Sequence, residues 1–213
     1  MRNKVNILIV TVLLAALVGH AAGFGDDPAP SNEYQVKAAF IYNFLKFVNW
    51  PEERVTDGSE EKGPDSSETI TIGIIGKDSF KNTFEAVKKK PVKNKKIIIK
   101  RFGQYHRLIG DKAKSDANIE ALRQCHLLFV CSSEKQNYKK IIELVRDHNV
   151  LTIGEIDGFL ETGGIINFIL EQKKLVFEVN LVAGKRAKLE ISSKLLRIAK
   201  RVIKEQPSAK VKD

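Results

Sequence analysis

The chain has 213 residues, 43% of them hydrophobic and 29% charged, and its 36 Lys and Arg against 26 Asp and Glu give a formal net charge of +10. This composition is too apolar for a disordered chain and too mixed for a protein that crosses a membrane many times. A chain of this length usually forms one domain with a sizeable core. Two cysteines are too few for a disulfide-stapled scaffold or for a zinc site built from thiolates.

The first 23 residues have the pattern of a secretory signal peptide. Arg2 and Lys4 give a basic start, Val5–Val18 is almost entirely apolar, and small residues follow over Gly19–Gly23. The apolar run is interrupted and is shorter than the ~20 residues of a membrane-spanning helix. We therefore expect export, with cleavage near residues 21–23. The basic residues alternate with apolar ones and form no stripe with exposed aromatics, so they predict no nucleic-acid binding and point to solvated faces, anionic lipids or acidic protein partners.

After a polar leader at residues 24–32, an amphipathic helix is expected. Ser31 or Asn32 is a suitable N-cap, and Glu33 stands in the first turn, where the helix dipole favours an anion. Trp50-Pro51 ends the pattern, because the residue before proline disfavours helical geometry. Residues 52–68 are expected to form a polar loop. The predicted apolar face of the helix consists of Val36, Ala39, Phe40, Asn43, Phe44, Phe47 and Val48.

From Thr69 onward, short β-branched runs alternate with helical patterns. Strands are expected at 70–75, 96–102, 125–131 and 150–153. The helices between them are one capped by Asp78 or Ser79 that carries Phe80, Phe84 and Val87, one around 119–122, and one over 138–145 that begins with a capping box at Ser133 and Gln136. This alternation predicts an α/β fold, with a mostly parallel sheet flanked by helices in an α/β sandwich.

The pattern changes in the last third of the chain. Residues 164–170 and 175–179 predict two strands joined by a short polar turn, which makes an antiparallel β-hairpin. The apolar residues between Leu189 and Ile203 recur at helical spacing and predict one long closing helix. We therefore expect a single domain over residues 33–205, followed by a polar, basic tail at 206–213.

The sequence contains no recognisable catalytic or metal-binding constellation. A phosphate-binding loop around Gly73–Asp78 would need glycine in place of Thr71 and a hydroxyl residue after Lys77. The four histidines are scattered, and the Gly-x-Ser-x-Gly motif of a nucleophile elbow is absent. The sequence thus predicts no catalytic residue, no metal site and no cofactor, and an exported hydrolase is the function that it favours least.

Two further local features leave alternatives open. Cys125 and Cys131 would lie ~20 Å apart on an extended strand, which is too far for a disulfide unless the strand starts after Cys125 and the chain folds back. Thr152, Glu155 and Asn167 are polar residues within or next to apolar runs, close to expected strand ends. Buried polar groups need hydrogen bonds, so these three residues either fasten loops, which we favour, or contact a ligand.

Five segments, read in order, resemble the YfiR family of small exported proteins. Their order and spacing cover nearly the whole chain after the expected signal peptide. The segments are Glu33–Pro51, Val150–Gly154, Gly163–Phe168, Val176–Asn180 and Ile191–Leu196.

The resemblance implies a periplasmic, dimeric regulator with an α/β sandwich fold and no enzymatic activity. The best-understood members bind the periplasmic sensor domain of an inner-membrane diguanylate cyclase and hold the cyclase inactive, which lowers cyclic di-GMP. An outer-membrane lipoprotein can sequester such a repressor, which raises cyclic di-GMP and favours biofilm. These are the partners that the resemblance implies for this chain.

The resemblance also suggests where a partner would bind. The family's hydrophobic C-terminal region is associated with partner contact, and its equivalents by position are Asn180, Leu181, Ser192, Ser193, Leu195 and Leu196. The polar insert at 52–68, the basic run at 88–96 and the sparse cysteines depart from the family pattern, and they leave the partner's identity open. The alternative function is a periplasmic small-ligand-binding or sensor protein acting with a membrane receptor, in which Thr152, Glu155 and Asn167 would face the ligand.

Overall fold

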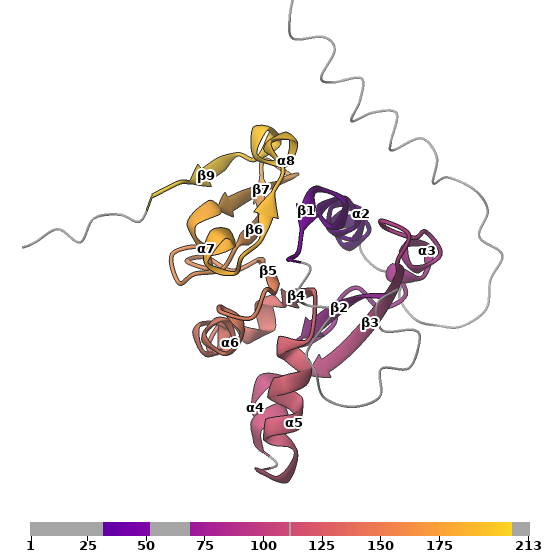
Figure 1. The fold of residues 1–213 in the computed structure, drawn as a ribbon, viewed down its shortest axis with the longest axis vertical. Coiled ribbons are helices and arrows are strands. Elements are labelled where there is room, and N and C mark those ends of the chain that lie inside the picture. The colour runs from indigo at the N-terminus through magenta and orange to yellow at the C-terminus, as the bar shows by residue number, and fades with distance from the viewer. Residues whose placement is uncertain (1–31, 52–68, 111, 206–213) are drawn as a thin grey trace, which may run out of the picture.

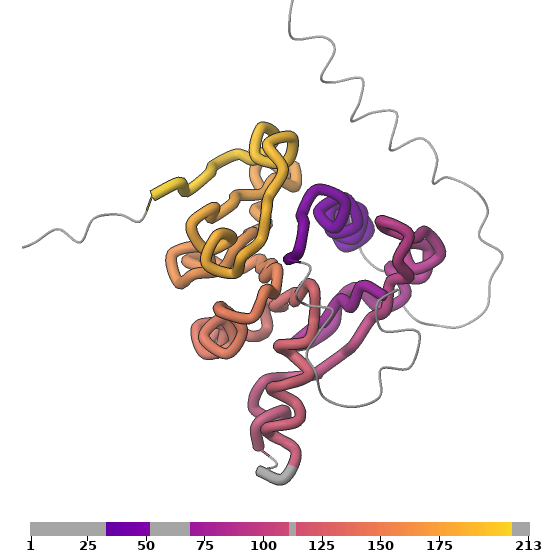
Figure 2. Tube along the Cα trace, in the orientation of Figure 1, coloured from indigo at the N-terminus to yellow at the C-terminus, as the bar shows by residue number. Residues whose placement is uncertain are grey.

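The computed structural model describes residues 32–51, 69–110 and 112–205. The expected signal peptide, the leader up to residue 31, the loop at 52–68 and the tail at 206–213 lie outside the described residues. Two layers of helices cover a twisted sheet in the described part (Figures 1 and 2).

The described residues form a seven-stranded sheet in the order β3-β2-β4-β5-β6-β7-β9. Neighbouring strands run parallel, except for the antiparallel pair β6 and β7. The predicted mostly parallel α/β sheet and the C-terminal hairpin are therefore confirmed. The strands are β2 (Thr69–Ile75), β3 (Lys96–Gly103), β4 (Leu127–Val130), β5 (Leu151–Gly154), β6 (Ile166–Glu171), β7 (Lys174–Asn180) and β9 (Arg201–Ile203).

Alternating side chains of the central strands supply two separate cores, one on each face of the sheet. Leu127 and Phe129 of β4 point into the first core, and Leu128 and Val130 point into the second. Helices α2 (Asn32–Phe47), α3 (Phe84–Lys88) and α8 (Ser193–Ile198) cover the first core. Helices α4 (Tyr105–Gly110), α5 (Lys112–Arg123) and α6 (Tyr138–Val145) cover the second.

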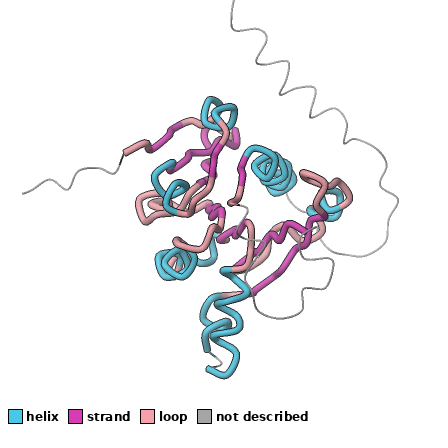
Figure 3. The backbone as a smooth tube through the Cα atoms, viewed as in Figure 1, coloured by secondary structure: helices cyan, strands magenta, loops and turns pink. Residues whose placement is uncertain are grey.

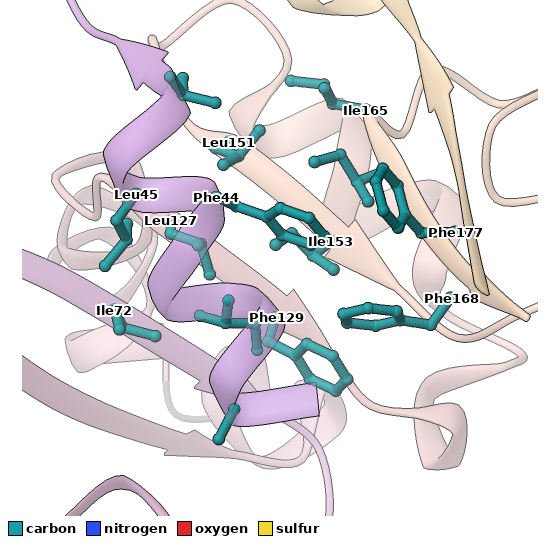
Figure 4. Close-up of a cluster of buried hydrophobic side chains, with 14 of the residues drawn as sticks. Phe44, Leu45, Ile72, Leu127, Phe129, Leu151, Ile153, Ile165, Phe168 and Phe177 are labelled. Atoms are coloured by element: carbon teal, nitrogen blue, oxygen red, sulfur yellow. The ribbon is translucent and has the colours of Figure 1, made fainter. Parts of the chain in front are cut away.

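Helix α2 forms as predicted, but its predicted buried face is wrong by a rotation about the helix axis. The residues that face the core are Lys37, Ala38, Ile41, Phe44, Leu45 and Val48, whereas Ala39 is exposed and Phe40 is half-buried. The helix is apolar on two sides, so its periodicity alone cannot tell which side meets the sheet. Phe44 makes the deepest contacts, with ring centroids 5.8 Å from Phe168 and 4.9 Å from Phe177 (Figure 4).

The caps predicted at Asp78 and at Ser133 are wrong, because each of these side chains is used elsewhere. The Oδ1 atom of Asp78 accepts a hydrogen bond from the backbone N–H of Phe80, but α3 begins only at Phe84. Ser133 lies in a short 3-10 helix, and its Oγ atom accepts a hydrogen bond from the N–H of Lys77. Helix α6 then begins at Tyr138 without a side-chain cap.

The single closing helix predicted for 189–203 is also wrong. The segment is divided among β8 (Glu190–Ile191), which pairs with β1 (Val48–Asn49), then α8 and β9, and α7 (Leu181–Arg186) precedes them (Figure 3). Ser192 accepts a hydrogen bond from the N–H of Lys194 and so starts a new helix. Strand β8 pairs with β1 and β9 pairs with β7, so the backbone of these residues is used in sheet pairing instead of in helical hydrogen bonds.

The turn of the β6–β7 hairpin consists of two residues. Gln172 and Lys173 link β6 to β7, and both have positive φ, as a tight two-residue hairpin turn requires.

The two cysteines form no disulfide bond. Cys125 and Cys131 flank β4, and both are free and buried.

Candidate functional site

A hydrogen-bonded cluster lies where β4 and β5 end, which is the edge where open α/β sheets usually bind ligands. Glu155 follows β5, and its Oε1 atom accepts hydrogen bonds from the hydroxyl of Tyr34 and from the N–H of Ser132, both at 3.0 Å. The ammonium group of Lys37 donates to Glu155 and also to Glu33. The cluster joins the first turns of α2 to the ends of two sheet strands.

This ion pair is buried. The side chains of Lys37 and Glu155 are only 4% and 7% exposed, while that of Glu33 is 39% exposed. Burial raises the pKa of Tyr34, and the negative charge of Glu155 adds to the rise. Burial alone would lower the pKa of Lys37, but its hydrogen bonds to Glu155 and Glu33 outweigh burial and raise the pKa. The protonated forms of both side chains are therefore favoured in the folded protein.

These pKa shifts predict a loss of stability at alkaline pH. Tyr34 and Lys37 hold their protons more tightly in the folded state than at their ordinary pKa values of 10.0 and 10.5. Their contribution to the free energy of unfolding is therefore complete below about pH 10 and is lost as the pH rises through the folded pKa values. Urea unfolding from about pH 8 to pH 11 measures the loss. Tyr34→Phe should show a shallower fall, and coincident curves for the two proteins would contradict the role of Tyr34.

A small pocket of about 220 Å³ adjoins the cluster. Its polar wall consists of the cluster residues, and Phe168, Leu170 and Leu175 form its apolar wall. Ligand sites are typically larger, at ~300–1,000 Å³. Lys37 and Glu155 already pair with each other, so the main role of the cluster is to fasten α2 to the sheet. The size and the two kinds of wall of the pocket suit a small group with one polar and one apolar side.

The three weak ligand-binding candidates separate in the structure. Glu155 lines the pocket, but Thr152 and Asn167 are buried away from it. The Thr152 hydroxyl accepts a hydrogen bond from the N–H of Ile165, and the Asn167 side chain accepts one from the N–H of Ile156. Both residues thus hold the segment between β5 and β6.

Tyr34 and Lys37, two partners of Glu155 in this cluster, were not among the predicted site residues. Tyr34 and Lys37 lie one helical turn apart on α2, and the Lys37 ammonium is 4.4 Å from the centre of the Tyr34 ring. Lys37 stands between Val36 and Ala38 in an apolar stretch of α2. A lysine embedded in an apolar helix face was the available signal, since such a cation is buried only when paired.

The six residues predicted for partner binding lie at two places in the C-terminal part. Asn180 starts α7, where its side chain accepts from the N–H of Ala183 and donates to the carbonyl of Leu160, and Leu181 is half-buried beside it. The other four, Ser192, Ser193, Leu195 and Leu196, lie at α8. Leu195 is fully buried and anchors α8, Leu196 is half-buried, and Ser193 is exposed.

Exposed apolar side chains lie next to α8. Ile198 is 64% exposed at the end of this helix, and Leu170 is 58% exposed near the tip of the β6–β7 hairpin. The parallel register of β9 with β7 sets Arg201 beside Glu178, so the end of α8 lies next to the first half of β7 (Figure 1). We call Phe40, Leu170, Leu175, Leu196 and Ile198 the hairpin–α8 surface. Phe40 belongs to it because its ring lies 6.0 Å from Phe168 and 5.8 Å from Phe177.

The described residues offer little other chemistry. Over 32–51, 69–110 and 112–205, no group of three or more His, Cys, Asp and Glu side chains is placed to hold a metal ion. Within these ranges, no helix has the length and apolar character needed to cross a membrane. Burial raises the pKa of Cys131 far above its ordinary value, which makes its thiol a poor nucleophile.

The fold of this chain is similar to those of known proteins. Among solved structures, it is similar to a conserved domain protein from Vibrio cholerae O1 biovar eltor, with a TM-score of 0.51, 10% identity, and coverage of 79% of this chain and 60% of that one. This chain thus spans 60% of the length of the Vibrio protein, and the likeness concerns the fold alone. An ABC domain in complex with L-Trp from Streptococcus pneumonia aligns with a TM-score of 0.46 and 11% identity over 63% of this chain and 55% of that one.

Sequence comparison is more specific. A search of curated proteins gives no significant match. The family model described as YfiR/HmsC-like matches residues 34–200. This range begins in α2, ends just before β9 and includes the hairpin–α8 surface and the cluster around Glu155 except for Glu33. The chain belongs to the YfiR/HmsC-like family.

Proposed function

We propose that the mature protein, residues 24–213, is a periplasmic repressor that binds the periplasmic sensor domain of an inner-membrane diguanylate cyclase and lowers cyclic di-GMP. Membership in the YfiR/HmsC-like family indicates a periplasmic regulator of diguanylate cyclase rather than an enzyme. The basic, apolar and small residues of the first 23 positions support export by a cleavable signal peptide.

Repression of this kind needs no covalent chemistry. The protein would bind the inactive conformation of the sensor domain more tightly than the active one, and the ratio of the two affinities sets how far the equilibrium moves. A shift from 99% active to 99% inactive requires a ratio of about 10⁴. Such a ratio needs a contact surface that only one conformation of the partner can match.

The hairpin–α8 surface is the observation that carries this proposal. Ile198 and Leu170 leave large apolar areas in water on two segments that β9 pairing and the Lys200–Glu171 ion pair hold side by side, and exposed apolar patches mark interaction sites. Leu196 of this surface and the adjoining Ser193 are among the residues predicted for partner contact. The ion pair of Lys200 with Glu171 lies at the edge of the surface and gives it a polar rim.

Ile198→Asp should abolish repression without unfolding the protein. A charge at the centre of an apolar contact typically costs a hot-spot energy of ≥ ~2 kcal/mol, so binding should weaken more than about tenfold. In a deletion strain, wild-type protein should lower cyclic di-GMP, whereas Ile198→Asp should leave it as high as in the deletion. The matched control is Ile109→Asp on α4, where the wild-type residue is 36% exposed and distant from the surface.

The outcomes of this experiment separate clearly. Restored repression by Ile109→Asp with none by Ile198→Asp supports the proposed surface. Equal repression by both variants would reject the surface, and an unchanged cyclic di-GMP level on deletion of the gene would reject the function. A photo-crosslinker at position 198 should then capture a membrane protein with a GGDEF domain.

The remaining parts of the proposed circuit come from the family resemblance. We include a homodimer as the active form, and an outer-membrane lipoprotein that sequesters it and so favours biofilm. Sedimentation of the mature protein tests the dimer. Release of cyclase activity on addition of the lipoprotein tests the sequestration.

The second candidate function is that of a small-ligand-binding protein acting with a membrane receptor. The pocket beside Glu155 favours it, because its walls combine charged and apolar side chains. Thermal-shift screening of periplasmic metabolites discriminates, since a ligand at 100 times its Kd adds ~2.7 kcal/mol to the free energy of unfolding. A shift that disappears in Glu155→Gln would favour the pocket as the functional site.

A further inference from the structure

Strand β3 is an open edge of the sheet. In the described part of the chain, this strand pairs only with β2, although it is eight residues long. Ile97 and Ile99 face the first core, so the alternate residues Lys96, Ile98 and Lys100 share the other face, where all three are exposed. Ile98 is 42% exposed between the two lysines. Long exposed edges readily accept another strand.

Positive charge is concentrated along this edge. Residues 86–110 contain nine Lys and Arg and no Asp or Glu. Lys88 pairs with Glu85, and Arg101 pairs with Asp78. Within the described residues, no acidic partner is found for Lys89, Lys90, Lys95, Lys96 and Lys100. The pKa of Lys93 is lowered by burial and by the charge of Lys95, as expected where cations are crowded.

We propose that β3 accepts an extended acidic segment of a partner protein as an added strand. In such strand addition, main-chain hydrogen bonds supply affinity and alternate side chains supply specificity. The exposed row Lys96, Ile98, Lys100 predicts the pattern of the incoming segment: two acidic residues four positions apart, with an apolar residue midway between them. Opposite charges and apolar pairs across neighbouring strands are each favourable.

Charge argues against a second copy of this chain as the added strand. An antiparallel pair of β3 strands centred on Ile98 would place Lys96 of each copy opposite Lys100 of the other, and like charges opposite each other are destabilising. The edge also lies at the opposite end of the sheet order from β7 and β9. The inference is therefore independent of repression through the hairpin–α8 surface, and both partners could bind at once.

A labelled peptide of the order Ser-Glu-Thr-Val-Thr-Glu-Ser is the probe, and fluorescence anisotropy with the mature protein is the measurement. We expect binding to wild-type protein that weakens at least about tenfold in Lys96→Glu/Lys100→Glu, because attraction is replaced by repulsion. This variant should instead bind the peptide in which both Glu are Lys. The matched control is Lys139→Glu/Lys140→Glu, which changes two exposed lysines of α6 and should bind as wild type does.

Further arms distinguish strand addition from other occupants. Proline in place of the central Val should abolish binding, because proline removes a main-chain donor. Equal binding of this proline peptide, or binding to phosphatidylglycerol vesicles in the absence of peptide binding, would overturn the proposal in favour of a general anion surface. Residues 52–68 contain seven Asp and Glu. If the peptide binds only after these seven residues are changed to Asn and Gln, the proposal is overturned, and the occupant of the β3 edge is the segment 52–68 of the same chain.

Discussion

Replacement of Lys37 by methionine should lower the free energy of unfolding by about 3–5 kcal/mol, the usual cost of removing one partner from a buried ion pair. The methionine side chain fills a similar volume, so packing is largely kept. The loss arises because the carboxylate of Glu155, whose side chain is 7% exposed, then remains buried without its cation. Urea unfolding at neutral pH measures the change.

Two further variants test this explanation. Lys88→Met removes the cation of an exposed pair with Glu85 and should cost less than ~1 kcal/mol. The double variant Lys37→Met/Glu155→Gln should recover much of the loss, because replacing both members of a buried pair with uncharged groups is far less costly than removing one. If Lys37→Met is as stable as the wild-type protein, Glu155 must gain contact with solvent or another partner when Lys37 is absent.

Phe44→Ala should destabilise the protein to a similar extent, by about 3–5 kcal/mol. Phe44 is fully buried and contacts the rings of Phe168 and Phe177, which belong to the two strands of the hairpin (Figure 4). The truncation leaves a cavity where α2 meets the sheet, and the surrounding strands cannot collapse to fill it. Thermal and urea unfolding both report the loss.

The control for this cavity lies on the same helix. Phe40→Ala removes an equally large ring that is only half-buried, so less of its surface returns to water and the loss should be smaller. Equal losses for the two variants would mean that helix α2 is stabilised by ring contacts irrespective of burial. A minor loss for Phe44→Ala would contradict the packing of α2 on β6 and β7.

Much of the sheet could be predicted from local patterns. The run Ile70–Ile75 is continuously β-branched apart from Gly73, and Leu127–Val130 is continuously apolar, because both strands are buried on two faces. The hairpin could be predicted because two such runs flank a short polar turn. The rotated face of α2 could not be predicted, since both of its sides carry apolar residues and the choice depends on the sheet that it meets.

The candidate site shows the same division. Glu155 was recognisable as a polar residue after an apolar strand, but Lys37 lies 118 positions earlier in the chain. Similarly, the exposed row on β3 depends on the position of that strand at the end of the sheet. The strand itself was predictable from Lys96–Phe102, whereas its edge position follows from the order in which all the strands pair.

The α/β class, most strands, the hairpin and the family follow from the amino-acid sequence, because they depend on residue periodicity and on the order of short motifs. Long-range packing divides residues 189–203 into β8, α8 and β9 instead of one helix. The same packing brings Lys37 to Glu155 and sets the end of α8 beside the β6–β7 hairpin. The physical reason is that the spacing of apolar residues indicates only which secondary structure a segment can form by itself. The pairing of strands and the partners of buried charged groups depend on residues far away in the chain.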